Sequence, residues 1–145
     1  MIEKIIVIVV GLIGGIAVGL QSPIAGNMGQ RIGGTASSFI VHFSGMVLSG
    51  ILLIFLGGEN IREWRTLPWY MLIAGIFGVI LYQAINFVLP RLGGTTMIML
   101  IIIGQLTMGI LVDHFGWFGV TPRPIDLTRG IGVAVLLLGG YLISK

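Results

Sequence analysis

Polar side chains are rare in the apolar stretches of this chain, and most of those present carry an amide or a hydroxyl group. Such groups donate and accept hydrogen bonds without carrying charge, and each costs free energy in a nonpolar setting unless it is paired or hydrated. Their chemistry therefore suits the binding of a small polar or amphipathic solute. The residues that we predict to bind it are Gln21, Ser22, Asn27, His42, Gln83, Asn86 and Gln105.

His42 is the only ionisable side chain well inside an apolar stretch, and it shares a helical face with Ser38, Gly45 and Ser49. Histidine changes its charge in the physiological pH range, so His42 is a candidate for proton coupling. A neutral histidine that only holds helices together by hydrogen bonding is the alternative. Asp113 is the second candidate for a coupled proton, and its alternative is a structural ion pair with Arg123 or Arg129.

Several kinds of reactive site are missing from the sequence. No apolar stretch has a carboxylate near its centre, and the chain has no cysteine. A phosphate-binding glycine-rich loop with lysine, a metal-ligand cluster and a nucleophile–base pair are also absent. We therefore predict that the protein is not an enzyme and that it uses no metal or cofactor.

The elements that position these residues are five apolar segments, each about the 17–25 residues that a helix needs to cross a bilayer. Lipid offers the backbone no hydrogen-bond partners, and the segments lack the period-two alternation of a barrel. The sequence predicts an all-α membrane protein with a single five-helix transmembrane domain over residues 1–145. The predicted helices cover about residues 5–28, 36–56, 68–89, 95–112 and 127–143.

Composition supports this class, because 56% of the residues are hydrophobic and only 9% are charged. The basic residues are spread singly over the loops, which favours contact with lipid headgroups over nucleic acid. The first apolar run is too long for the core of a signal peptide, so we expect it to be retained. Asp126 or Thr128 is expected to cap the last helix.

An odd number of helices places the two termini on opposite sides of the membrane. The N-terminal side carries five basic residues (Lys4, Arg62, Arg65, Arg123 and Arg129), and the other side carries three (Arg31, Arg91 and Lys145). This weakly favours a cytoplasmic N-terminus. Such a small bias leaves two possibilities open, namely a single orientation and insertion in both orientations.

The predicted binding residues fall at similar depths in the membrane. With the N-terminus inside, Gln21, His42 and Gln83 each lie roughly 6–8 Å to the outer side of the midplane. Asn86 is one turn beyond Gln83, and Gln105 lies close to the midplane. Pro23 cannot donate a backbone hydrogen bond, so it is expected to kink the first helix near this layer, as in many transporter sites.

Glycine is abundant, with 24 residues. Gly11, Gly15 and Gly19 share one face of the first helix, and Gly45 gives the second helix a similar small face with Ser49. The last two helices also contain pairs of small residues (Gly104 with Gly109, and Gly130 with Ala134). Small residues allow helices in a membrane to approach closely, so we expect these faces to pack against other helices.

The chain resembles the YdcZ family, the five-helix branch of the drug/metabolite transporter superfamily. The resemblance covers essentially the whole chain and is carried by Gly19-Leu20-Gln21-Ser22-Pro23, Pro68-Trp69-Tyr70, Gly104-Gln105 and Asp113-His114-Phe115-Gly116-Trp117-Phe118-Gly119. It implies a bacterial inner-membrane protein that moves small metabolites or drug-like solutes. Larger members of the superfamily resemble two such units fused in opposite orientations.

The expected function is therefore that of half a transporter, working by alternating access as an inverted homodimer or with a related five-helix chain. The alternative is a non-transporting membrane subunit that packs against a larger partner, with the polar layer as interhelical glue. A channel is less favoured, because the sequence has no ring of charges and no repeated carbonyl filter.

Overall fold

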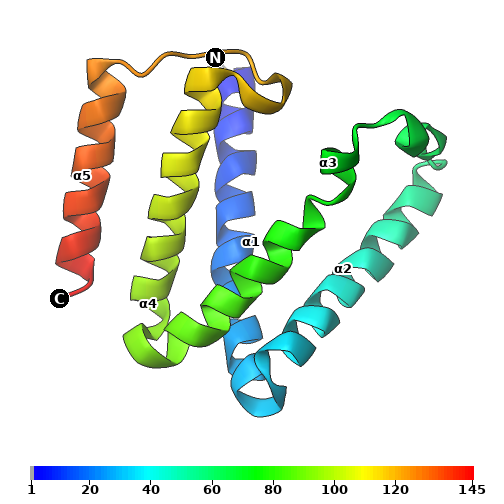
Figure 1. The fold of residues 1–145 in the computed structure, drawn as a ribbon, viewed down its shortest axis with the longest axis horizontal. Coiled ribbons are helices and arrows are strands. Elements are labelled where there is room, and N and C mark those ends of the chain that lie inside the picture. Colours follow the sequence, from blue (N-terminus) through cyan, green and yellow to red (C-terminus); the bar gives the residue numbers. More distant parts are fainter. Residues whose placement is uncertain (1) are drawn as a thin grey trace. The chain divides into compact units, whose positions relative to one another are not determined.

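The computed structural model describes residues 2–145, and this part of the chain contains helices and loops but no strand (Figure 1). The five α-helices are α1 (Ile2–Ile32), α2 (Gly34–Phe55), α3 (Trp69–Leu72), α4 (Gly75–Phe115) and α5 (Leu127–Ile143). Two short 3₁₀ helices, Ile61–Thr66 and Trp117–Gly119, lie in the loops. The predicted all-α membrane class is confirmed.

Glycines with positive φ mark the ends of the membrane-spanning stretches. Gly33 (φ 93°, ψ 145°) separates α1 from α2, and Gly93 (φ 78°, ψ 167°) interrupts α4, so that its two halves match two predicted segments. Gly57 and Gly58 also have positive φ and follow the end of α2. Residues without a Cβ adopt these conformations at little cost, which explains why the chain turns at these positions.

Length and hydropathy agree with the predicted spans. Three stretches are long and apolar enough to cross a membrane: Ile2–Ile32, Gly34–Phe55 and Trp69–Phe115. The last has 47 residues and includes the break at Gly93, so each part on either side of that glycine has the length of one span. The fifth segment, α5, is a shorter apolar helix of 17 residues.

The third predicted segment differs from expectation at its start. It begins with the single turn of α3, and backbone bonds between residues three apart, such as Ile76 N to Ile73 O (2.9 Å), connect that turn to α4. Such bonds belong to a tighter 3₁₀-like geometry. The third segment was predicted to start at Pro68, and α3 starts at the next residue, Trp69, with Pro68 as its N-cap.

Contacts within the chain divide it into two compact units, residues 1–91 and 92–145, which we describe separately. In the first unit the buried apolar side chains are Ala25, Tyr82 and Ile85. Ser22, Ser37 and Ser38 are buried among them. The packed centre of this unit therefore lies near the turn at Gly33, whereas most of α1 is exposed.

The glycine faces predicted to pack have no close neighbour within their own unit. A Cβ built on Gly11, Gly15 or Gly19 would meet no neighbour within 4 Å among residues 2–91, and the same holds for Gly45. Gly104, Gly109 and Gly130 are equally open within residues 92–145. Other glycines make the close approaches: Gly26, Gly29, Gly34 and Gly78 in the first unit, and Gly116 and Gly140 in the second. Spacing shows where helices could approach, but it does not say which face finds a neighbour inside one chain.

Candidate functional site

Three helical segments of the first unit bring polar side chains together near the turn at Gly33. We call this group the polar cluster, and its members are Gln30, Thr35, Ser38, His42, Tyr82, Gln83 and Asn86. The cluster includes three of the predicted binding residues, His42, Gln83 and Asn86. Gln21, Ser22 and Asn27 are on α1, and Gln105 belongs to the second unit.

The side chain of His42 lies between α2, to which it belongs, and α4. Its Nδ1 is 2.7 Å from the carbonyl oxygen of Ser38 and 3.4 Å from the hydroxyl of the same residue. The imidazole meets the Tyr82 ring edge to face, with centroids 5.3 Å apart. A Cβ built on Gly78 would lie 2.6 Å from His42 Nε2, so this glycine admits the imidazole against α4.

Gln83 and Asn86 join α4 to the start of α2. Gln83 Nε2 donates to Thr35 Oγ1 at 3.1 Å, and a Cβ on Gly34 would lie 2.8 Å from Gln83 Oε1. The amide of Asn86 sits directly over Gly29, in the space that a side chain there would occupy. These contacts place both amides on the face of α4 that the other two helices approach.

One of the two polar side-chain atoms of Asn86 makes no hydrogen bond to residues 2–145. Its Nδ2 donates to the carbonyl of Tyr82 at 2.7 Å, whereas its Oδ1 is buried and has no hydrogen-bond partner among residues 2–145. A buried acceptor without a partner costs free energy on the order of 1–3 kcal/mol. Such an atom is a candidate contact for a donor on a bound solute.

Gln30 donates a hydrogen bond to a carbonyl of α4 that lacks its usual backbone donor because of a proline. Pro90 lies inside α4 and has no N–H to donate to the carbonyl of Asn86, four residues earlier. Gln30 Nε2 donates to that carbonyl at 3.0 Å. This amide was not predicted as part of the site, although a proline four residues after a polar helical position signals a carbonyl that needs a donor.

The α1 residues predicted for the site have different environments. Ser22 is buried and its hydroxyl donates to the carbonyl of Val18 at 2.8 Å. Gln21 and Asn27 are exposed and make no side-chain hydrogen bond to the part of the chain that the structure describes. The helix continues through Pro23 from Ile2 to Ile32.

Sequence reasoning also missed Ser37, Tyr82 and Gly78. The hydroxyl of Ser37 is fully buried and donates to the carbonyl of Ala25 at 2.7 Å, which ties α2 to α1. Tyr82 and Gly78 are one turn apart on α4, on the face that His42 meets. Their only signal in the sequence was this four-residue spacing to each other and to Asn86.

The second unit holds Asp113 in a network that closes the loop between α4 and α5. Asp113 Oδ2 is 3.4 Å from the Arg129 guanidinium, which also donates to the Arg123 carbonyl at 3.1 Å. The Arg123 N–H donates to the Asp113 carbonyl at 2.7 Å. Asp126 caps α5 by accepting from the Arg129 N–H at 2.8 Å, which confirms one of the two predicted capping residues.

His114 also contributes a hydrogen bond to this loop. Its Nδ1 accepts a hydrogen bond from the backbone N–H of Ile125 at 3.2 Å. Gly116 turns the chain with φ 64°, and a Cβ there would lie 2.7 Å from Pro122 Cγ. The Asp-His-Phe-Gly stretch therefore folds back onto the residues that precede α5.

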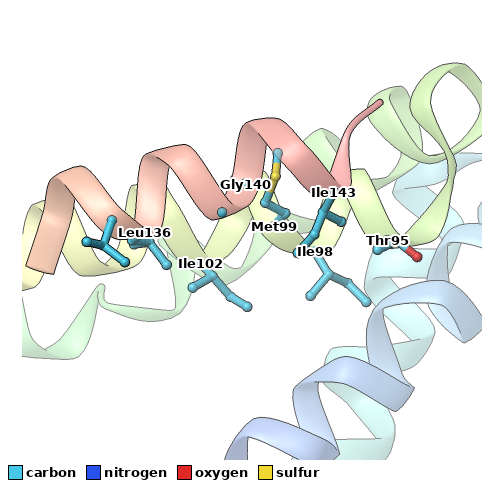
Figure 2. A pocket seen from close by; sticks show the side chains of 9 residues that line it. Thr95, Ile98, Met99, Ile102, Leu136, Gly140 and Ile143 are labelled. Atoms are coloured by element: carbon cyan, nitrogen blue, oxygen red, sulfur yellow. The ribbon is translucent and has the colours of Figure 1, made fainter.

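An apolar groove of about 410 Å³ runs between the second half of α4 and α5 (Figure 2). Gly140 brings the two helices close, because a Cβ there would lie 2.8 Å from Met99 Sδ. Figure 2 shows Ile98, Ile102 and Leu136 along the groove and the hydroxyl of Thr95 at one end. Gln105 is exposed in this unit, does not line the groove, and makes no side-chain hydrogen bond to residues 2–145.

The arrangement combines apolar spans with uncharged polar groups and lacks any cluster of His, Asp or Glu that could hold a metal within residues 2–145. Comparison with known proteins agrees with a role in membrane transport. No curated protein and no solved structure matches the chain. A family model described as "Putative inner membrane exporter, YdcZ" matches residues 6–142, almost the whole sequence. The chain therefore belongs to the YdcZ family.

Proposed function

We propose that this membrane protein moves a small polar or amphipathic solute by alternating access, as an inverted homodimer, and that it catalyses no chemical reaction. The observation that carries the proposal is unused hydrogen-bonding capacity in an apolar helical protein. Asn86 Oδ1 has no partner within residues 2–145, and neither have the exposed amides of Gln21 and Gln105. Polar groups in membrane helices are costly, and those that are not spent on packing point to a solute pathway.

The open glycine faces support the homodimer. Gly11, Gly15 and Gly19 form a stripe on α1, and a Cβ built on any of them would meet no neighbour within 4 Å among residues 2–91 of its own unit. A second copy would cover such a face with a closely packed helix, for which small residues are suited. The five-to-three distribution of basic residues is small enough to permit both orientations.

Opposite orientations would give the pair its two states. Each copy would contribute a polar cluster, and inversion would place the two clusters on opposite sides of the midplane. One state opens the shared pathway to one side, and the other opens it to the second side. The two states are related by symmetry, so the inverted pair accounts for alternating access without a second gene product.

The competing function is that of a subunit whose polar layer only holds helices together. Partnered amides such as Gln30 and Gln83 favour it, because each already spends its donor inside the chain. Such contacts contribute only about 0.6 kcal/mol each on average in a membrane protein. The two functions therefore predict opposite effects for amides with and without a partner.

Transport by reconstituted protein tests the proposal. Liposomes containing the purified chain would be loaded with a fluorescent dye, ethidium or rhodamine B, and dye efflux would be followed under an imposed pH gradient. We expect efflux above that of empty liposomes. Gln105→Leu should lower it about tenfold, the factor that corresponds to 1.4 kcal/mol of lost binding free energy.

The matched control is Gln105→Asn, which keeps the amide and should retain most of the efflux. Thermal unfolding in detergent would be measured for both variants and should not change. Wild-type efflux with undiminished transport by Gln105→Leu would remove this residue from the site. No efflux of either dye, together with a single orientation in cells, would favour the subunit function.

A further inference from the structure

The hydrogen bond of His42 determines which of its nitrogens carries the proton. The carbonyl oxygen of Ser38, 2.7 Å from Nδ1, can only accept, so Nδ1 must donate. In the neutral imidazole the second nitrogen, Nε2, then holds a lone pair. No group within residues 2–145 donates a hydrogen bond to Nε2. This nitrogen is not fully enclosed by the protein.

Gly78 determines where Nε2 lies. A Cβ on this glycine would lie 2.6 Å from Nε2, but 3.5 Å and 3.6 Å from the adjacent ring carbons Cε1 and Cδ2. The nitrogen is therefore the ring atom closest to the Cβ position of Gly78 on α4. A methyl group at this position would push the imidazole away and disturb its bond to Ser38. Gly75, three residues earlier on the same helix, meets nothing within 4 Å and gives a matched comparison.

We propose that His42 takes up and releases a proton at Nε2, and that Gly78 is the positioning residue that brings this nitrogen against α4. The proposal rests on the proposed transport function and identifies the atom that would couple it to protons. A proton from water binds the Nε2 lone pair and produces an imidazolium with one positive charge. The bond from Nδ1 to Ser38 survives this step, so no hydrogen bond is lost on proton uptake.

The surroundings explain how this charge acts on the helices. The groups that face the ring are the backbone and hydroxyl of Ser38, the Gly78 backbone and the Tyr82 side chain. Tyr82 is the one titratable side chain among them, and no carboxylate of the first unit is paired with His42. His42 is half-buried, and a cation without a counter-ion is costly inside a membrane. Protonation therefore favours the state in which α2 and α4 separate at Gly78 and water reaches Nε2.

His114 provides an internal reference because its hydrogen bond has the opposite sense. Its Nδ1 accepts from the Ile125 N–H, so the neutral ring carries its proton on Nε2. The chain has two histidines. The structure thus assigns them opposite tautomers, and one spectrum can compare them.

Nitrogen NMR of histidine tests the proposal without knowledge of the solute. The full-length chain, labelled with ¹⁵N-histidine, would be studied in lipid bicelles from pH 9 to pH 5, a range that includes the pH interval of about 5–8 in which histidine titrates. Removal of one set of signals in His42→Gln assigns the rest. We expect His42 to carry its proton on Nδ1 at high pH and to gain the second proton at Nε2 as the pH falls.

Gly78→Ala should replace the single His42 tautomer by a mixture of both, whereas Gly75→Ala should leave it unchanged. A His42 that carries its proton on Nε2 at high pH, or remains neutral down to pH 5, would overturn the proposal. An unaltered His42 tautomer in Gly78→Ala would remove the role of Gly78. Circular dichroism of each variant would establish that the helices are retained.

Efflux measurements separate this proposal from the proposed function. His42→Gln keeps an amide that can donate to the Ser38 carbonyl, but it cannot titrate. We expect this variant to unfold at the wild-type temperature and to lose the pH dependence of dye efflux. Persistence of that pH dependence would overturn the proton role while leaving transport intact. Absence of efflux from the wild type, with the expected NMR result, would contradict only the transport function.

Discussion

The polar cluster near Gly33 and the loop between α4 and α5 use polar residues in different ways. In the loop, Asp113 is paired with Arg129, whose guanidinium also donates to the Arg123 carbonyl. The His114 Nδ1 accepts from a backbone N–H, and Asp126 caps the following helix. Each of these side chains has a partner inside the loop, so the network fixes a connection.

The polar cluster leaves atoms unused. Asn86 Oδ1 is buried without a partner within residues 2–145, and His42 Nε2 accepts no hydrogen bond there. The cluster is held by uncharged groups and by glycines that let side chains approach a helix backbone. The difference suggests how to distinguish binding groups from packing groups in a membrane protein. A network whose polar atoms all have partners stabilises the fold, whereas one with unpartnered atoms remains available for a ligand.

The largest effect on stability is expected at Gly29, where a new side chain would occupy the place of the Asn86 amide. Gly29→Ala should lower the free energy of unfolding by about 1–3 kcal/mol, as overpacking commonly does. Chemical unfolding in detergent micelles would measure it. The control is Gly14→Ala, whose Cβ meets no atom within 4 Å; a similar loss there would show that this contact is not special.

The loop should respond next. Arg129→Ala removes both the ion pair with Asp113 and the bond to the Arg123 carbonyl, and we expect a loss of about 1–2 kcal/mol because the two side chains are partly exposed. The loss should shrink at high salt, which screens the ion pair. Arg65→Ala, at an exposed arginine over Trp64, serves as the control. Equal stability of Arg129→Ala and wild type would contradict a structural role for the network.

Amides with and without a partner should differ by a smaller amount. Gln30→Leu frees the Asn86 carbonyl opposite Pro90 and should cost about 1 kcal/mol. Gln21→Leu removes an amide that makes no hydrogen bond to residues 2–145 and should leave the unfolding temperature unchanged. Dye efflux should show the reverse order, with the greater loss in Gln21→Leu. Stability losses of the same size in both variants would favour the subunit function.

The smallest effect is expected at the His114 side chain in the loop. His114→Phe removes the Nδ1 that accepts from the Ile125 N–H, so this amide loses its hydrogen bond. Hydrogen exchange at the Ile125 amide, corrected for intrinsic rates, should therefore become faster relative to the Arg129 amide, which Asp126 caps. Unchanged protection of Ile125 in the variant would mean that the bond to His114 contributes nothing.

Hydropathy and segment length were sufficient to predict the five helices, because lipid leaves a helix as the only way to satisfy the backbone. Gly33 and Gly93 were recognisable as breaks, since both precede a second glycine. The sequence did not reveal which glycines make contact. Gly29 and Gly78 are packed, while Gly11 and Gly15 have no close neighbour within residues 2–91, and this depends on helix crossings that no local pattern encodes.

The site was predictable in part for a similar reason. Polar residues at one depth led to His42, Gln83 and Asn86, which lie in one cluster. Ser37 and Gln30 were missed because their partners are backbone carbonyls on other helices. The assignment of these residues to solute binding stays a prediction, as does a single domain over the whole chain. The tautomers of the histidines could not have been predicted, since they depend on single hydrogen bonds.

The most direct test of the central claim, an inverted homodimer, is topology in cells. The chain contains no cysteine, so one would be introduced at Glu59 or, separately, at Ser144, which the five predicted spans would place on opposite sides. Whole cells would be treated with a membrane-impermeant thiol reagent. We expect about half of the molecules to be labelled at each position, because each copy inserts both ways. Complete labelling at Ser144 with none at Glu59 would mean a single orientation and would contradict the inverted homodimer.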